Sequence, residues 1–82
     1  MSRVYLKPGL LTRWRQFAGI KQSAIAHDCG WTQSSQSHAE RGTMSVPRSK
    51  LNIMHQVLEA ALQDSDLPAP SKKDLIQRGG KP

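Results

Sequence analysis

The side chains best able to do chemistry in this sequence are a few acids, imidazoles and one thiol. Between residues 20 and 42 the only acids are Asp28 and Glu40, and no nucleophile elbow, phosphate loop or paired-carboxylate arrangement occurs. The potential metal ligands lack the dense spacing of a zinc site: His27, Cys29, His38 and His55. We therefore expect no enzyme activity, no metal site and no cofactor.

The charged residues are distributed unevenly along the chain. The net charge is +6, and residues 1–50 hold eight Lys or Arg against two acids, whereas residues 51–82 hold four of each. This excess predicts a polyanionic partner, either nucleic acid or an anionic membrane surface, with a solvated basic face as the alternative. Three early cations are candidates for phosphate contacts or for solubility alone: Arg3, Lys7 and Arg13.

The size and composition of the chain exclude several classes of protein. Its 82 residues are enough for one small domain and too few for a multidomain enzyme. The longest apolar run is three residues, whereas a transmembrane helix needs about twenty and a signal peptide roughly seven. The single cysteine cannot form a disulfide within the chain and agrees with a reducing cytoplasm. We expect a cytoplasmic protein with no membrane partner.

Apolar spacing and capping residues predict an all-α fold, a compact bundle of four to five helices with no strand of useful length. Gly30 and Gly42 mark helix ends, because glycine readily adopts the left-handed conformation there. Thr32 is a good N-cap, and Ser71 with Asp74 resembles a capping box. The predicted helices span residues 8–18, 22–29, 32–41, 47–62 and 72–78.

Two short helices separated by a glycine turn suggest a helix-turn-helix. The segment 22–42, QSAIAHDCGWTQSSQSHAERG, resembles the Cro/cI (XRE-type) family of helix-turn-helix repressors and follows the family pattern without a gap. The matching positions are Gln22, Ile25, Ala26, Gly30, Thr32, Ser37, Glu40 and Gly42. The resemblance covers roughly residues 10–62 and implies a λ-repressor-like DNA-binding domain.

By this resemblance, residues 32–41 form a recognition helix that enters the major groove of DNA. Gln33 is the best candidate for reading a base, because a glutamine amide pairs with both N7 and the amino group of adenine. The base-contacting candidates share one helix face: Gln33, Ser34, Ser37 and His38. The phosphate-contacting candidates are Lys21, Gln22, Thr32, Ser35, Arg41, Ser45 and Arg48. Arg15 and Glu40 match a family ion pair that joins the first helix to the recognition helix.

Several residues differ from the family pattern. Gln36 and Ala39 stand where the family has larger apolar residues, and Trp31 replaces Val or Ile after the turn glycine. We expect the bulk of Trp31 to fill the space that the other two leave. Lys21 takes the place of the usual Ser or Thr cap, where a cation opposes the helix dipole and a nearby phosphate would explain it. Cys29 occupies an apolar family position, which predicts core packing.

The resemblance implies a DNA-binding domain over residues 1–63, with the helix-turn-helix at 22–41. Residues 64–82 then form a linker, a short helix and a frayed tail. One copy reads only a half-site, so we expect a homodimer on a pseudo-palindromic operator, acting as a small transcriptional repressor in a prokaryotic, phage or plasmid setting. The dimerisation candidates, which could instead fold back onto the core of the monomer, are Leu67, Leu75 and Ile76.

Two other functions stay open. The first is an antitoxin-type helix-turn-helix protein, which binds a toxin through the neutral C-terminal segment and autoregulates its operon. The second is a nonspecific binder of nucleic acid or of anionic membranes driven by the charge of +6 alone. That function predicts steep salt dependence and no preference for sequence.

Overall fold

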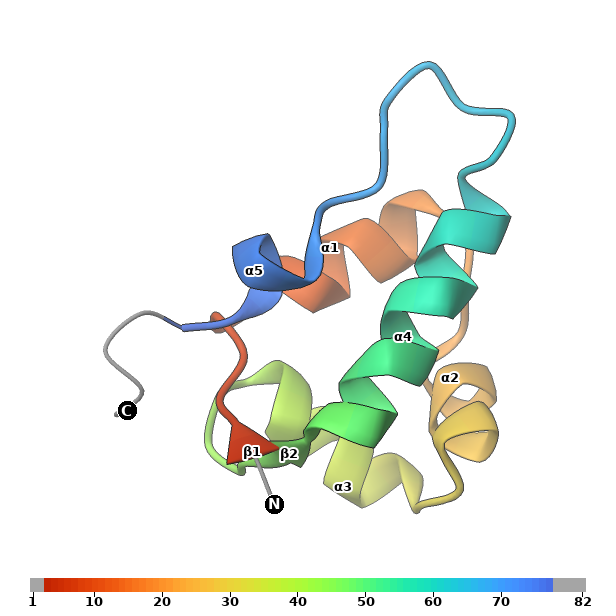
Figure 1. The fold of residues 1–82 in the computed structure, drawn as a ribbon. Helices are drawn as coiled ribbons and strands as arrows, with labels where there is room; N and C mark the ends of the chain where they lie inside the picture. The colour runs from red at the N-terminus through yellow and green to blue at the C-terminus, as the bar shows by residue number, and fades with distance from the viewer. Residues whose placement is uncertain (1–2, 78–82) are drawn as a thin grey trace.

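Helices form most of the chain, and they lie close to the positions that the apolar spacing predicts. The computed structural model describes residues 3–77 (Figure 1). Its helices are α1 (Leu10–Phe17), α2 (Gln22–Cys29), α3 (Gln33–Glu40), α4 (Arg48–Ala61) and α5 (Lys72–Leu75). The predicted end of α2 is confirmed, because Gly30 follows it with a φ of 78°. No helix within residues 3–77 is long and apolar enough to cross a membrane.

Helix α4 provides the central apolar stripe of the core. Leu51, Met54 and Leu58 recur at spacings of three and four residues and are buried. Leu11 of α1 and Ile25 of α2 belong to the same cluster. The other members of the core include Val4, Leu6, Cys29, Ala39, Val46 and Leu75. The expected core packing of the cysteine is therefore confirmed.

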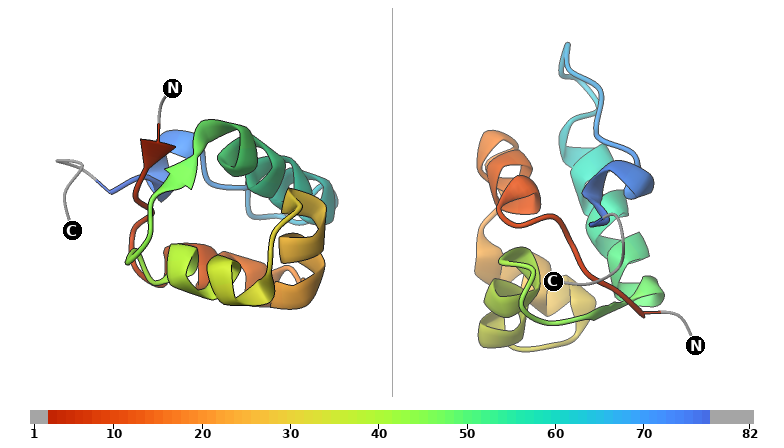
Figure 2. Two further views of the ribbon diagram at one scale, coloured as in Figure 1. Left: turned by 90° about the horizontal axis from the view of Figure 1, so that it is seen from below. Right: turned by 90° about the vertical axis from the view of Figure 1, so that its left-hand side faces the viewer.

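Helix α3 lies at one end of the molecule, and the loop of residues 62–70 lies at the other. Figure 1 shows α3 at the bottom and the loop at the top, and the right-hand view of Figure 2 shows the same separation. Seen from below, α3 lies in front of α1, and α4 lies on the opposite side (Figure 2, left). Helix α2 contacts both α3 and α4 and so connects the two sides.

The structure contains a small antiparallel sheet that the all-α prediction does not include. It consists of β1 (Arg3–Val4) and β2 (Val46–Pro47), with Arg3 opposite Pro47 and Val4 opposite Val46. Both valines are buried, and the Arg3 side chain donates hydrogen bonds to Oγ and O of Ser45 at 2.7 and 3.0 Å. Strands of two residues are too short to show the apolar–polar alternation that identifies a strand in a sequence.

The C-terminal segment packs against the N-terminal one. The backbone N–H of Lys7 donates to the Leu75 carbonyl at 2.8 Å, and Leu6 and Ile76 form an antiparallel bridge. Because Ile76 is extended there, α5 ends at Leu75 instead of continuing to residue 78. The capping box predicted from Ser71 is confirmed, with both of its hydrogen bonds present.

This packing corrects two of the dimerisation candidates. Leu75 is only 1% exposed and lies in the core of its own chain, so its side chain is not available to a second copy. Ile76 is partly buried against the same core. Both side chains therefore fold back onto the core of the monomer, which is the alternative that the sequence leaves open. Leu67 is exposed. The predicted tail at 79–82, and residue 78 at the predicted helix end, lie outside the described residues.

Candidate nucleic-acid interface

Helix α3 has one polar exposed side and one buried side. Thr32 caps the helix by accepting a hydrogen bond from the Ser35 N–H at 3.1 Å, as predicted. The side chains of Gln33, Ser34 and His38 are exposed, and Ser37 is partly buried. The only acid in the helix, Glu40, is buried, so α3 presents no exposed carboxylate. The exposed side therefore offers amide, hydroxyl and imidazole groups without a negative charge.

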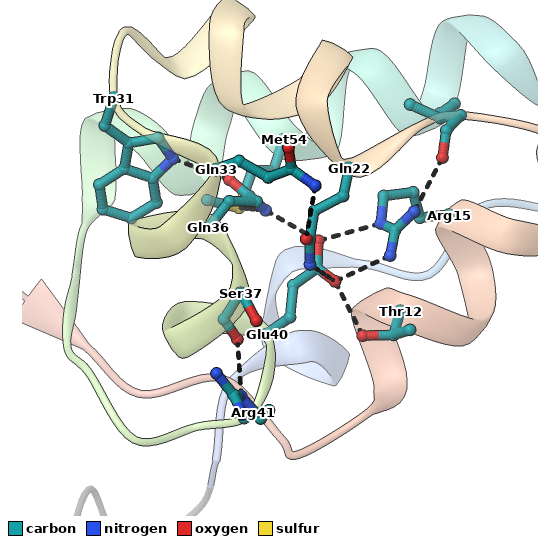
Figure 3. A network of polar contacts seen from close by, with 11 residues as sticks. Thr12, Arg15, Gln22, Trp31, Gln33, Gln36, Ser37, Glu40, Arg41 and Met54 are labelled. Carbon is teal, nitrogen blue, oxygen red and sulfur yellow. Dashed lines mark hydrogen bonds and ion pairs between the residues drawn. The ribbon is translucent and has the colours of Figure 1, made fainter.

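A buried carboxylate holds the inner side of α3 in place (Figure 3). Glu40 is 1% exposed and accepts hydrogen bonds through both of its oxygens. Oε2 accepts from Arg15 Nε and from Gln36 Nε2, both at 3.0 Å. Oε1 accepts from Thr12 Oγ1 at 2.8 Å, Arg15 Nη2 at 3.1 Å and Gln22 Nε2 at 3.2 Å. These bonds join α3 to both α1 and α2.

The Arg15–Glu40 ion pair expected from the family resemblance is confirmed. Arg15 donates one hydrogen bond to each oxygen of Glu40, and this bidentate geometry is stronger and more specific than a single hydrogen bond. Arg15 also donates through Nη1 to the Ile20 carbonyl at 3.0 Å, which fixes the connection between α1 and α2. Burial alone would raise the pKa of Glu40, but hydrogen bonds from Arg15, Gln36 and Thr12, together with the charge of Arg15, outweigh burial and lower it.

Trp31 and Gln36, both of which differ from the family pattern, form a pair. Trp31 Nε1 donates to Gln36 Oε1 at 2.8 Å, and Gln36 Nε2 donates onward to Glu40. The Gln36 side chain is fully buried, so both ends of its amide need partners. The prediction that Trp31 compensates by its bulk is therefore incomplete, because its indole N–H also satisfies the buried carbonyl of Gln36.

Gln22 connects the buried network to the exposed side of α3. Its Nε2 donates to Glu40, and its Oε1 accepts from Gln33 Nε2 at 3.3 Å. The structure thus brings Gln22, a predicted phosphate contact, next to Gln33, a predicted base contact. Figure 3 shows the two amides between α2 and α3. Because Gln22 is itself held by its hydrogen bond to Glu40, the hydrogen bond between Gln22 and Gln33 restricts the orientations that the Gln33 amide can adopt.

The predicted phosphate contacts lie around α3 and differ in their exposure to solvent and in their hydrogen bonds. Lys21 and Arg48 are exposed at the starts of α2 and α4, and Arg41 is exposed just after α3, where its Nε donates to the Ser37 carbonyl at 3.4 Å. Ser35 is partly buried and accepts from Thr32 Oγ1. Ser45 already accepts the hydrogen bonds from Arg3 described above. The serines are therefore less free than the cations.

Sequence reasoning missed the contributions of Thr12 and Thr43. Thr12 is the donor closest to Glu40, and Thr43 Oγ1 donates to the His38 carbonyl at 3.1 Å beyond the end of α3. Nothing in the helical periodicity distinguishes either threonine from its neighbours. Lys50 is a further addition, because its Nζ donates to the Cys29 carbonyl at 2.8 Å and lies 5.3 Å from the Trp31 ring centroid. It thereby caps the C-terminus of α2.

The cysteine next to this cap is a structural residue. Its thiol donates to the Lys50 carbonyl at 3.7 Å. Burial raises the pKa of Cys29 and Asp28 adds to the increase, while Lys50 opposes it. The thiol is therefore kept in its neutral form. No group of three or more His, Cys, Asp or Glu side chains within residues 3–77 is placed to hold a metal ion.

Comparison with known proteins adds no relative to these observations. No protein-family model, no curated protein and no solved structure matches the chain. The structure defines a small helical protein with a two-stranded sheet. The geometry of α2, α3 and the residues around them is therefore the basis for its function.

Proposed function

We propose that this protein binds double-stranded DNA in a sequence-specific manner through a helix-turn-helix formed by α2 and α3. It acts as a small repressor of the Cro/cI type, with two copies on the half-sites of a pseudo-palindromic operator. Repression follows from occupying a promoter. The observation that carries this proposal is the contrast between the two sides of α3, one fixed by Glu40 and the other exposed, polar and free of acids.

Fixation of the buried side supports a role in recognition. An α-helix with its side chains is about 10–12 Å across, and the major groove of B-DNA is about 12 Å wide. A helix that fits so closely reads bases only if its rotation about its own axis is fixed. Glu40 provides this constraint, because its hydrogen bonds to Arg15 and Gln22 connect α3 to α1 and α2.

The exposed groups match what DNA offers. Gln33 lies at the first position of α3, where its amide has the donor and acceptor needed for adenine. Lys21, Arg41 and Arg48 are exposed cations on the elements next to α3 and suit phosphates on either side of the groove. The N-terminal amides of α2 beside Lys21 also favour an anion.

Selection of bound duplexes from a random DNA library tests this proposal. We expect a palindromic consensus that binds about 10³-fold or more tightly than random DNA, measured by fluorescence anisotropy at two salt concentrations. Enrichment would supply the operator. If no sequence is enriched and the affinity follows the salt concentration alone, the protein is a nonspecific polyanion binder, and the proposed function is wrong.

Gln33→Ala should weaken binding to the selected operator by about 1–3 kcal/mol and relax specificity at one base pair. The reason is that the variant loses both hydrogen bonds to one base edge, whereas contacts to phosphates remain. The measurement is anisotropy on the operator and on duplexes substituted at each position. Gln56→Ala, at an exposed glutamine of α4, is the matched control and should change nothing. Equal weakening on every duplex would show that Gln33 does not read a base.

A further inference from the structure

An apolar hollow lies between α1 and the loop of residues 62–70, away from α3. Its volume is about 280 Å³, and its surface is almost wholly apolar. We call this site the apolar hollow. The residues that line it are Leu10, Arg13, Trp14, Phe17 and Leu67. Pockets for small molecules usually have volumes of about 300–1,000 Å³. The hollow is at the small end of that range and offers almost no polar surface to orient a ligand, so it suits one or two inserted apolar side chains better.

The hollow collects apolar surface that the core does not use. Within residues 3–77, Phe17 and Leu67 are the large apolar side chains that remain exposed, at 56% and 51%. They come from distant parts of the chain yet line the same hollow. Trp14 extends this surface, because its ring meets the Phe17 ring edge-on with centroids 6.0 Å apart. Large exposed apolar side chains gathered at one place indicate a contact surface.

Arg13 is the charged residue that lines the hollow, and acids stand close to Leu67 in the sequence. Arg13 lines it on α1, and Asp66 immediately precedes Leu67 in the loop, with Asp64 nearby. In the part of the chain that the structure describes, none of these three side chains forms an ion pair. The hollow is therefore lined by an unpaired cation on α1, and two acids without an ion pair lie within three residues of Leu67 in the loop that forms its other wall. It is complementary in charge to a copy of itself.

We propose that the apolar hollow binds a second copy of this chain. In a two-fold symmetric contact each residue pair occurs twice. Leu67 of one copy then lies against Phe17 of the other, and Asp66 of each copy faces Arg13 of the other. This arrangement buries the exposed apolar side chains and pairs the unpaired charges in one step.

The position of the hollow decides what such a contact does. Because α3 lies at the opposite end of the molecule from the loop (Figure 1), the two α3 helices of this dimer face away from each other. The contact therefore cannot place two copies side by side on neighbouring half-sites. If the proposed DNA-binding function is correct, the back-to-back contact joins copies that are bound to separate DNA segments.

Sedimentation equilibrium of the full chain without DNA tests the contact itself. We expect a concentration-dependent dimer, and Phe17→Ala should raise its dissociation constant by roughly tenfold or more, because the lost aromatic contact occurs twice. Gln16→Ala, at the exposed neighbouring residue of α1, is the control and should leave the constant unchanged. A monomer at the concentrations of a nuclear magnetic resonance sample would overturn the proposal, as would a dimer that Phe17→Ala does not weaken.

Charge reversal tests the orientation of the two copies. Arg13→Glu alone and Asp66→Arg alone should each weaken the dimer, because each brings like charges together at both symmetric positions. Mixing the two single variants should give a heterodimer in which both symmetric contacts again join opposite charges, and the double variant in one chain does the same, so both should recover the wild-type constant. A double variant as weak as the singles would show that these residues do not face each other. Circular dichroism of each variant confirms that it is folded.

DNA experiments separate this proposal from the proposed function. Two duplexes with different fluorophores should be brought together by the wild-type protein and not by Phe17→Ala, while anisotropy shows that each duplex is still bound. If the protein dimerises as described but binds no DNA, the contact stands and the proposed function fails. If it binds DNA and stays monomeric in solution, the contact fails and the proposed function stands.

Discussion

Glu40→Ala should lower the free energy of unfolding by about 3–5 kcal/mol, the range for removing one partner of a buried ion pair. The loss is large because the Arg15 guanidinium stays buried with only the Ile20 carbonyl as a partner. Gln36 also loses the carboxylate acceptor of its Nε2 group, which keeps only the weak acceptor Met54 Sδ at 3.9 Å. A buried donor left without a partner costs about 1–3 kcal/mol in desolvation. Because the donors around Glu40 belong to one network, their separate costs do not sum to the total loss.

Urea denaturation followed by circular dichroism measures this effect. Glu59→Ala removes the same side chain at an exposed position of α4 and should change the free energy of unfolding by no more than about 1 kcal/mol, as expected for a surface pair such as His55–Glu59. Arg15→Ala combined with Glu40→Ala should cost less than the sum of the single changes, because the second change removes the stranded charge. A loss below 1 kcal/mol for Glu40→Ala would contradict the role of the carboxylate as the centre of the network.

Leu75→Ala should lower the free energy of unfolding by about 2–5 kcal/mol, as for other large-to-small changes in a core. Leu75 is 1% exposed, and its side chain belongs to the same cluster as Leu6 and Leu58. The change therefore leaves a cavity at the junction of the two chain ends. The same denaturation experiment measures the effect, and Lys73→Ala, at an exposed position of α5, is the control.

This result separates two roles that the sequence leaves open for the C-terminal segment. A residue that only joins two copies would affect stability through the protein concentration, whereas a core residue lowers it at every concentration. We expect the loss on Leu75→Ala to be the same in dilute and concentrated samples. A loss that disappears on dilution would assign Leu75 to an interface after all.

The helices and part of the site could be predicted because their causes are local. Thr32, Gly30 and the Ser71 capping box act within a few residues of themselves, so the sequence is enough to find them. The Arg15–Glu40 pair lies farther apart in the chain, and it was predicted only because the family resemblance supplied the partner.

The features that escaped prediction depend on residues that meet only after folding. Nothing near Leu75 in the sequence indicates that it joins the same core cluster as Leu6, since these residues belong to opposite ends of the chain. Trp31 and Gln36 each look unfavourable when a pattern is read one position at a time. The sequence predicts that the bulk of Trp31 compensates for Gln36, but the hydrogen bond from the Trp31 indole N–H to the Gln36 carbonyl oxygen is seen only in the structure.

The pairing of Leu6 with Ile76 also has a consequence for biosynthesis. A ribosome synthesises α1 to α4 before Leu75, so Leu6 still lacks the C-terminal segment that packs against it while those residues are added. Contacts between distant residues form slowly because a long loop must close first. Completion of the core therefore waits until residues 75–77 have left the exit tunnel. Until then, the nascent chain exposes the apolar side chain of Leu6 and the unpaired backbone groups of residues 5–7, the type of surface that makes unfinished chains prone to aggregation.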